Sequence, residues 1–385
     1  PQAQHSIHIG SAERVATANE LLIYPRSVAV IVASAGEDLP QRIAQALQAA
    51  KVALPALACL VAPEERMACL ALREAALALA VPLRFVASAS DVDTLARNAV
   101  PEARLIATAH ELVIAVAEQP LQVNLIGRPR GRLAVIGLGP GAAELMVPAV
   151  KAELARATDV LGYETYVRMA GPFREDQVQH CTDNREEMQR ARHAFELAAQ
   201  GRSVVVVSSG DPGVFAMAAA VIEALHESSD PTWHQVDLQI LPGVSASLAT
   251  AAQAGAPLGH DFCVMSLSDN LKPWSIIEKR LDLAAQADLV LAFYNPISKS
   301  RPHQLGVALE VVRRHRDGST PVVLGRDIGR PGQTLKVVTL AELLPEMVDM
   351  RTMVLIGSST TCAFPRAGGG EWVYTPRWYG EKPAS

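Results

Sequence analysis

The segment SSGDPGVFAM, residues 208–217, has the residue types of a ligand-binding turn. It follows four consecutive valines and precedes an alanine-rich segment with helical character. Gly210 and Gly213 permit backbone angles that other residues resist, and Pro212 fixes one angle between them. The turn offers bare amides and the Asp211 carboxylate at the carboxyl end of a predicted strand, where open α/β sheets bind small molecules. An ordinary strand-to-helix turn is the competing interpretation, because Gly, Asp and Pro are common turn residues.

A second loop of this kind follows another apolar run. The segment LAVIGLGPGAAEL fits the relaxed dinucleotide fingerprint G-x-G-x-x-G/A at Gly137, Gly139 and Ala142. Glu164, after the next predicted strand, can supply the acidic residue that such a site places on a ribose. Pro140 removes one amide donor from the loop, which weakens a pyrophosphate-binding interpretation. A tight structural turn and an NAD-dependent oxidoreductase are therefore both hypotheses for this segment.

Three further loops lie beside predicted strands. In LPGVSAS, residues 241–247, Ser245 and Ser247 can cap the following helix or present donors to a ligand. The segments FYNPISKSR, 293–301, and LGRDIGRPGQ, 324–333, each follow a strand. Isolated bases are usually solvated surface charges, but a group of them on two such loops favours an anionic substrate. The bases in question are Lys299, Arg301, Arg326 and Arg330.

Overall composition restricts the class of protein. With 385 residues, of which 49% are hydrophobic, the chain is long enough for two or three domains with large cores. Its net charge of −5 argues against nucleic acid as the main partner. No apolar run is long enough for a membrane span, and no signal-peptide pattern opens the sequence. Because the chain begins at Pro1, we expect a fragment or a processed product.

The cysteines and histidines predict no metal site. The five cysteines are scattered, and neither C-x-x-C nor H-E-x-x-H spacing occurs. This usage favours reduced, mostly buried thiols in a cytoplasmic protein rather than a disulfide framework. The cysteines are Cys59, Cys69, Cys181, Cys263 and Cys362.

Apolar strands that alternate with helical patterns predict a chain of α/β modules. In the first module we expect a small parallel sheet, with a helix over residues 110–118. The run GRPRG is polar and rich in helix and strand breakers, and it is interpreted as a linker. The predicted divisions are a tail or remnant of a preceding segment at 1–20, a small α/β domain at 21–126, the linker at 127–131, and two α/β halves at 132–232 and 233–385.

From about residue 133 to residue 379 the chain resembles the tetrapyrrole methylases, and among them the precorrin-3B (C-17)-methyltransferase branch. The resemblance covers nearly two thirds of the chain. The segments that carry it are, in order, GLGPG, ELMVPAV, LGYETYV, REEMQRARHAFELA, SSGDPGVFAMA, LPGVSA, GAPLGHDFCVMSLSD, PW, FYNPISKSR and GRDIGRPGQ.

The resemblance implies a class III (tetrapyrrole) methyltransferase fold. In that fold two unlike α/β domains hold S-adenosyl-L-methionine in a cleft between them, and much of the contact is made by backbone groups. The G-P-G turn lines the cleft, and the GDP turn approaches the methionine end of the cofactor. The residues expected to contact the cofactor are Pro140, Gly210, Asp211, Val214, Phe215, Ser245, Ala246, Tyr294, Asn295, Gly325 and Arg326.

The resemblance also implies a reaction. A methyl group passes to carbon 17 of precorrin-3B or cobalt-factor III, and ring contraction yields precorrin-4 on the pathway to cobalamin. The candidates for the proton movement are His260, Asp261 and Asp269, although an ordinary loop histidine bonded to backbone is the competing interpretation of His260. Homodimers are usual in the family. Substrate carboxylates are expected to pair with Arg185, Lys299, Arg301, Arg326 and Arg330.

Residues 21–126 resemble the C-terminal domain of the cobalamin-pathway protein that opens a lactone in cobalt-precorrin-5A. The Gly-Cys-Arg-Arg-Gly loop of that pattern is replaced here by ASAGEDL, so a degenerate or accessory domain is expected. Two other classes of function stay open beside the methyltransferase. One is the NAD-dependent oxidoreductase, and the other is a non-catalytic tetrapyrrole carrier.

Overall fold

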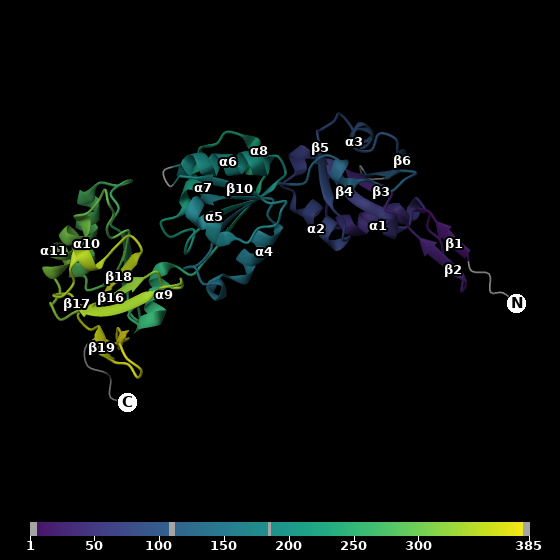
Figure 1. The fold of residues 1–385 in the computed structure, drawn as a ribbon. Coiled ribbons are helices and arrows are strands. Elements are labelled where there is room, and N and C mark those ends of the chain that lie inside the picture. Colours follow the sequence, from purple (N-terminus) through teal and green to yellow (C-terminus); the bar gives the residue numbers. More distant parts are fainter. Residues whose placement is uncertain (1–5, 108–111, 184–185, 380–385) are drawn as a thin grey trace. The chain divides into compact units, whose positions relative to one another are not determined.

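The computed structural model describes residues 6–107, 112–183 and 186–379 (Figure 1). The chain divides into two compact units, each made of separate stretches of sequence. Unit 1 comprises Pro1–Leu133, Ala191–Val204 and Ala224–Gln239. Unit 2 comprises Ala134–Arg190, Val205–Glu223 and Ile240–Ser385. No helix in the described ranges is long and apolar enough to cross a membrane.

The N-terminal part of unit 1 is a five-stranded sheet in the order β5-β4-β3-β7-β6. β3 is a continuous run of five apolar residues, all of them buried, which is typical of a strand covered on both faces. Val28, Val30 and Val32 pack against α1 and α2, whereas Ala29 and Ile31 pack against α3. The elements are β3 (Val28–Val32), α1 (Leu39–Ala49), β4 (Leu57–Pro63), α2 (Leu70–Ala78), β5 (Leu83–Val86), α3 (Val92–Ala99), β6 (Arg104–Ala107) and β7 (Leu112–Val116).

Two expectations for this region are wrong. The predicted helix over 110–118 is instead the strand β7 over its described core, and β7 pairs antiparallel with both β3 and β6. The sheet is therefore mixed rather than parallel. A short apolar run such as LVIAV suits a buried strand and a buried helix equally well, and pairing with β3 decides between them. Within the predicted tail, β1 (Ser6–Ile9) pairs in parallel with β2 (Glu20–Ile23).

The predicted linker is held against the edge of the N-terminal sheet. The N–H and C=O of Arg128 exchange hydrogen bonds with those of Phe85 in β5, at 2.9 and 2.8 Å. The Arg84 guanidinium donates to the Ile126 and Gly127 carbonyls at 2.7 and 2.8 Å. Gly127 itself has a φ of 44°, and a Cβ there would lie 2.0 Å from the Phe85 carbonyl oxygen. The segment thus extends the hydrogen-bonding of the sheet instead of forming a free tether.

A second five-stranded sheet has the order β10-β9-β11-β8-β12. Its unit 2 portion buries Ile136, Val160, Val205 and Val207 together with Val150. The strands and helices here are β8 (Arg132–Gly137), α4 (Pro148–Arg156), β9 (Asp159–Tyr163), α5 (Glu164–Ala170), β10 (Val178–Thr182), α6 (Glu187–Ala199), β11 (Ser203–Ser208), α7 (Met217–Glu227), α8 (Pro231–His234) and β12 (Asp237–Leu241).

The third sheet, in unit 2, has the order β14-β15-β18-β16-β17. Helices α10 and α11 cover one face and α9 covers the other. The elements are α9 (Ala246–Ala254), β14 (Phe262–Ser266), α10 (Trp274–Gln286), β15 (Val290–Tyr294), α11 (Gln304–Arg313), β16 (Pro321–Arg326), β17 (Thr334–Thr339) and β18 (Thr352–Ile356). A small sheet joins β13 (Gly255–Ala256), β20 (Glu371–Tyr374) and β19 (Cys362–Pro365). The α/β class predicted from the sequence is confirmed.

Strand directions in the third sheet determine which loops meet. β14 and β15 are parallel, while β18 is antiparallel to both β15 and β16. The carboxyl ends of β14, β15 and β16 therefore lie at one edge, with Tyr294 beside Ser266 and Arg326 beside Thr352. We call this the carboxyl edge of the third sheet. It contains two of the five loops for which the sequence predicts ligand binding, those that follow β15 and β16.

Candidate active site

Three glycine-containing loops of unit 2 meet with their backbones in contact. Gly139 and Gly210 exchange hydrogen bonds of 2.8 and 3.1 Å. A Cβ on Gly137 would lie 2.3 Å from the Gly210 carbonyl oxygen and 2.9 Å from the Gly243 nitrogen. Only residues without side chains permit this approach. We call the meeting point of Gly137, Gly210 and Gly243 the glycine junction.

Asp211 holds two of these loops by its carboxylate. One oxygen, Oδ1, accepts from the Gly213 N–H at 2.8 Å, and Oδ2 accepts from the Gly243 N–H at 3.0 Å. The Val214 N–H donates to the Asp211 carbonyl at 3.3 Å, which closes the turn. Both carboxylate oxygens therefore have backbone partners. The geometry suits a residue that shapes the junction, and it does not suit a free catalytic base.

The junction continues into the start of α9. A Cβ on Gly210 would lie 3.6 Å from the Ser245 Cα and 3.8 Å from the Ala246 nitrogen. The buried Ser245 hydroxyl lies 3.1 Å from that of Ser247. The Tyr294 hydroxyl accepts from the Ser247 N–H and donates to its Oγ, at 3.1 Å each. Tyr294 thereby connects β15 to α9.

An aromatic pair lies next to these groups. Phe215 has a φ of 53°, and its side chain stays 51% exposed. Its ring lies 5.4 Å from that of Tyr294, and the Lys272 ammonium lies 5.8 Å from the Phe215 centroid. Burial, with a smaller effect from the charge of Arg280, lowers the pKa of Lys272. An exposed ring held in a strained backbone conformation suits contact with a flat or cationic ligand.

The other predicted contacts on the carboxyl edge have distinct environments. Asn295, with a φ of 50°, donates from its side-chain amide to Ser266 Oγ at 3.0 Å. A Cβ on Gly325 would lie 2.4 Å from Thr250 Cγ2, so α9 packs where a side chain would be. Arg326 donates to Asp349 at 2.9 Å, and that bond raises the pKa of Arg326.

Arg330 connects loops that are far apart in the sequence. Its Nε donates to the Pro140 carbonyl at 2.9 Å, and its Nη2 donates to Ser209 Oγ at 3.1 Å. A Cβ on Gly141 would lie 2.6 Å from Arg330 Cγ, which shows how closely the side chain crosses the G-P-G turn. In this position Arg330 connects the G-P-G turn to the loop that follows β11. Two of its side-chain nitrogens, Nε and Nη2, thus have acceptors within the protein.

Arg330→Met is therefore expected to weaken binding of S-adenosylhomocysteine by roughly 10-fold, because two charge-assisted hydrogen bonds between loops are lost. Arg330→Lys should recover only part of this, since an ammonium cannot reproduce the guanidinium fork. Calorimetric titration measures both variants. An unchanged affinity for S-adenosylhomocysteine, combined with weaker tetrapyrrole binding, would instead assign Arg330 to the substrate.

The other basic residues predicted to bind substrate carboxylates differ in solvent exposure and in their partners. Lys299 is exposed, whereas Arg301 is only 7% exposed and belongs to the interior. Arg326 forms ion pairs with Asp327 and Asp349. Arg185 lies outside the described residues. The group expected to bind substrate carboxylates is thus not one uniform patch.

The three candidates for proton transfer are divided between two ends of β14. His260 and Asp261 precede β14, and Asp261 accepts through its carbonyl from Val290 N, at the start of β15. The His260 ring packs against Tyr379 at 5.3 Å, and its Nδ1 lies 3.7 Å from Asp261. The structure therefore does not bring this pair to the carboxyl edge. Asp269 follows the other end of β14 and accepts from Gln304 Nε2 at 3.4 Å.

Several residues at the site were not singled out from the sequence as ligand-binding residues. Ser209 and Gly243 lie inside segments that were recognised, so only their particular contacts were missed. Ser266 also lies inside a recognised segment, GAPLGHDFCVMSLSD, whereas Lys272 lies in the loop after β14, between two recognised segments. Gln304 at the start of α11 belongs to the same class.

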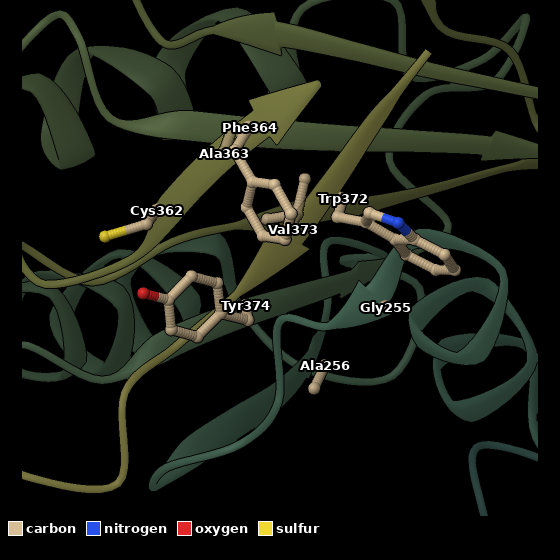
Figure 2. A pocket seen from close by; sticks show the side chains of 8 residues that line it. All are labelled: Gly255, Ala256, Cys362, Ala363, Phe364, Trp372, Val373 and Tyr374. Carbon is tan, nitrogen blue, oxygen red and sulfur yellow. The ribbon is translucent and has the colours of Figure 1, made fainter. Parts of the chain in front are cut away.

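An open apolar groove of about 760 Å³ lies elsewhere in unit 2 (Figure 2). It is formed by the β19–β20 hairpin and β13, and it contains no residue predicted for the site. Its lining is Gly255, Ala256, Cys362, Ala363, Phe364, Trp372, Val373 and Tyr374.

Among the described residues no group of three or more His, Cys, Asp or Glu is placed to hold a metal ion. All five cysteines are free; Cys59 is buried, but Cys181 and Cys362 are exposed, so the expectation of mostly buried thiols is only partly met.

The chain is similar to known methyltransferases of tetrapyrrole biosynthesis. A family model described as Tetrapyrrole (Corrin/Porphyrin) Methylases matches residues 132–344. The precorrin-3B C(17)-methyltransferase of Sinorhizobium sp is 51% identical over 249 residues, which are 65% of this chain and 97% of that protein. The cobalamin biosynthesis protein CobIJ of Mycobacterium tuberculosis (strain ATCC 25618 / H37Rv) is 47% identical over 255 residues, which are 65% of this chain but only 49% of CobIJ. The crystal structure of the methyltransferase CobJ is 53% identical with a TM-score of 0.60, and the match covers 64% of this chain and 100% of that one.

Proposed function

This chain belongs to the tetrapyrrole (corrin/porphyrin) methylases, and we propose that it transfers a methyl group from S-adenosylmethionine to carbon 17 of precorrin-3B or cobalt-factor III in cobalamin biosynthesis. The observation that carries the proposal is the similarity to nearly the whole of the Sinorhizobium precorrin-3B C(17)-methyltransferase. The second substrate is included because a probable cobalt-factor III C(17)-methyltransferase of Salmonella typhimurium is 38% identical over 93% of its length.

The residues of the candidate site fit S-adenosylmethionine as a ligand. The glycine junction presents backbone in place of side chains, and Phe215 and Tyr294 present rings suited to a cation or a flat base. The glycine-containing loops lack the lysine that a phosphate-binding loop of the type G-x-x-x-x-G-K-[ST] carries. When bound, S-adenosylmethionine supplies a sulfonium-activated methyl group. We propose that its contacts come from Pro140, Gly210, Asp211, Val214, Phe215, Ser245, Ala246, Tyr294, Asn295, Gly325 and Arg326.

The main task of the protein is alignment of the methyl donor with the acceptor carbon. Well-oriented reactants can gain roughly 7–11 kcal/mol of barrier reduction from proximity alone. The backbone-to-backbone contacts of the glycine junction and the Tyr294–Ser247 bonds restrict the loops that would do this. Ring contraction to precorrin-4 also needs a proton to be moved, and we assign that role to Asp269. Its half-buried carboxylate follows β14 near the carboxyl edge and is oriented by Gln304.

Asp269→Asn is expected to lower the rate of ring contraction by roughly 10²–10⁴-fold, the range for general acid–base catalysis. His260→Asn is the matched comparison, because that residue packs at the opposite end of β14 and should leave the rate nearly unchanged. Mass spectrometry of the products separates methylation from contraction. A large loss in His260→Asn with none in Asp269→Asn would restore the histidine as the proton-transfer residue.

The function itself is tested with isotopically labelled S-adenosylmethionine and each tetrapyrrole in turn. One labelled methyl group and an acetyl-bearing contracted ring are expected in the product. Methylation without contraction would remove the ring-contracting role and keep the methyltransferase. Tight binding of NAD, without binding of S-adenosylhomocysteine, would replace the proposal by the oxidoreductase hypothesis.

Two further parts of the proposal concern partners and location. We expect a homodimer in the cytoplasm, from the family resemblance and from the five free cysteines. Light scattering during gel filtration should give twice the mass of one chain, and a monomer would contradict the first expectation. Fractionation of cells that produce the chain tests the second.

We also propose that residues 21–126 are an accessory domain related to the cobalt-precorrin-5A hydrolase C-terminal domain. The stretch that corresponds to the Gly-Cys-Arg-Arg-Gly loop, ASAGEDL at 33–39, contains neither the basic pair nor the cysteine. In this region the Cys59 thiol is buried in the sheet, which raises its pKa to about 12 and makes it a poor nucleophile. The full chain should therefore leave the lactone of cobalt-precorrin-5A intact, and lactone opening would contradict the accessory role.

A further inference from the structure

Arg301 is a buried cation whose charge no carboxylate balances. It lies at the end of the loop that follows β15 and is 7% exposed. Its side chain makes one hydrogen bond within the described chain, from Nη1 to the Asn295 carbonyl at 3.3 Å. The Nε atom is buried and has no partner among the residues that the structure describes. No ion pair involves this guanidinium in the same ranges.

A buried guanidinium without an anionic partner is destabilising unless another group pairs with it. Burying an ionised side chain without a partner carries a penalty of several kcal/mol, so buried arginines are normally paired. The backbone around Arg301 holds the residue in place, since its N–H and C=O exchange hydrogen bonds with those of Ser298 at 3.0 and 3.2 Å. The nearby Gln304 likewise has a buried carbonyl oxygen, Oε1, without a partner in the described chain. Unmet donors and acceptors next to a reaction site indicate a polar ligand.

We propose that Arg301 recognises a carboxylate side chain of the tetrapyrrole substrate at the carboxyl edge of the third sheet. The assignment rests on the proposed function, because it takes the substrate to be a polycarboxylate. A guanidinium fork matches a carboxylate through two parallel N–H donors. Asn295 connects Arg301 to the aromatic pair of the candidate site. Its carbonyl accepts from Arg301, and it follows Tyr294, whose ring contacts Phe215.

The neighbouring bases have other roles in the structure. The donors of Arg330 reach Pro140 and Ser209, and Arg326 is paired with Asp349. Lys299 is exposed and therefore strongly hydrated. Arg301 alone among these four combines burial with an unbalanced charge. It therefore has the most to gain from an incoming anion.

The test uses the full chain with Arg301→Met, which keeps the side-chain length and removes the charge. Arg314→Met is the matched control, because this exposed arginine follows α11 and its side chain makes no hydrogen bond or ion pair with the described residues. Binding of cobalt-factor III is followed by its absorbance, and binding of S-adenosylhomocysteine by calorimetry. Thermal unfolding is recorded for each variant. Arg301→Lys examines whether a point charge restores part of the binding.

Arg301→Met is expected to weaken cobalt-factor III binding by roughly 10- to 100-fold, the effect of losing a charge-assisted hydrogen-bonded pair. Affinity for S-adenosylhomocysteine should not change, and the unfolding midpoint should hold or rise, because an unbalanced buried charge has been removed. Unchanged tetrapyrrole binding would overturn the assignment. A lower midpoint with parallel loss of both ligands would also overturn it, in favour of a structural role. If the wild-type chain binds cobalt-factor III through Arg301 but transfers no methyl group, the proposed function fails while this assignment stands.

Discussion

Gly137→Ala is expected to abolish measurable binding of S-adenosylhomocysteine and to destabilise the fold. The added Cβ would lie 2.3 Å from the Gly210 carbonyl oxygen, 2.8 Å from Pro212 Cδ and 2.9 Å from the Gly243 nitrogen. These neighbours are backbone or ring atoms, which cannot rotate away as a flexible side chain would. Overpacking of this kind costs about 1–3 kcal/mol, and a displacement of about 1 Å at a catalytic site can lower the rate by about 10²-fold.

The substitution is a clean test because Gly137 does not have a positive φ, so alanine suits its backbone conformation. Gly306→Ala is the matched control. It lies inside α11, where a Cβ would meet only Pro345 Cγ at 3.8 Å. That variant should keep full activity and gain up to about 1 kcal/mol from helix propensity. Calorimetry with S-adenosylhomocysteine and chemical unfolding measure both variants, and normal binding by Gly137→Ala would show that the glycine junction is dispensable.

Asp211→Asn is expected to weaken binding of S-adenosylhomocysteine by roughly 10- to 100-fold, the effect of losing one hydrogen bond to a charged acceptor. The carboxylate now accepts from the Gly213 and Gly243 N–H groups through separate oxygens. An amide keeps one acceptor and directs its NH₂ at an N–H donor, so one loop must move. The KM for S-adenosylmethionine should therefore rise more than kcat falls.

A comparable aspartate supplies the control for this second prediction. Asp317 accepts from the Ser319 N–H at 2.8 Å in an exposed turn, and Asp317→Asn keeps one acceptor for it. This variant should leave ligand binding unchanged. If Asp211→Asn lowers kcat by orders of magnitude and leaves the KM for S-adenosylmethionine unchanged, Asp211 would be a catalytic residue and not a residue that shapes the junction.

Much of the architecture follows from local sequence. The four valines before SSGDPG predict the buried β11, and the continuous apolar run of β3 predicts a strand with two covered faces. The turn residues at 210–213 and 241–243 indicate sharp chain reversals after strands. These features depend on a few neighbouring residues, so the sequence is sufficient for them. The family motifs, which are longer still, identify the reaction class.

The predictions from sequence are wrong where the structure of a segment depends on contacts with distant parts of the chain. The run LVIAV is a strand because β3 and β6 pair with it. The sequence of β10 predicts no strand, because its mostly exposed residues lack an apolar pattern. The predicted proton-transfer residues show the same limitation. His260, Asp261 and Asp269 are close in the sequence, yet the full length of β14 separates Asp269 from the other two.

Residue patterns alone predict the α/β class, the loops at strand ends and the relationship to the tetrapyrrole methylases. The contacts of individual side chains in those loops become apparent only in the folded chain. Arg301 and Arg330 look equivalent in the sequence, but one is a buried, unbalanced cation and the other clasps the G-P-G turn. Backbone conformation depends mainly on residues a few positions apart. The partners of a side chain depend on which strand ends share an edge, and that is settled by pairing between strands far apart in the chain.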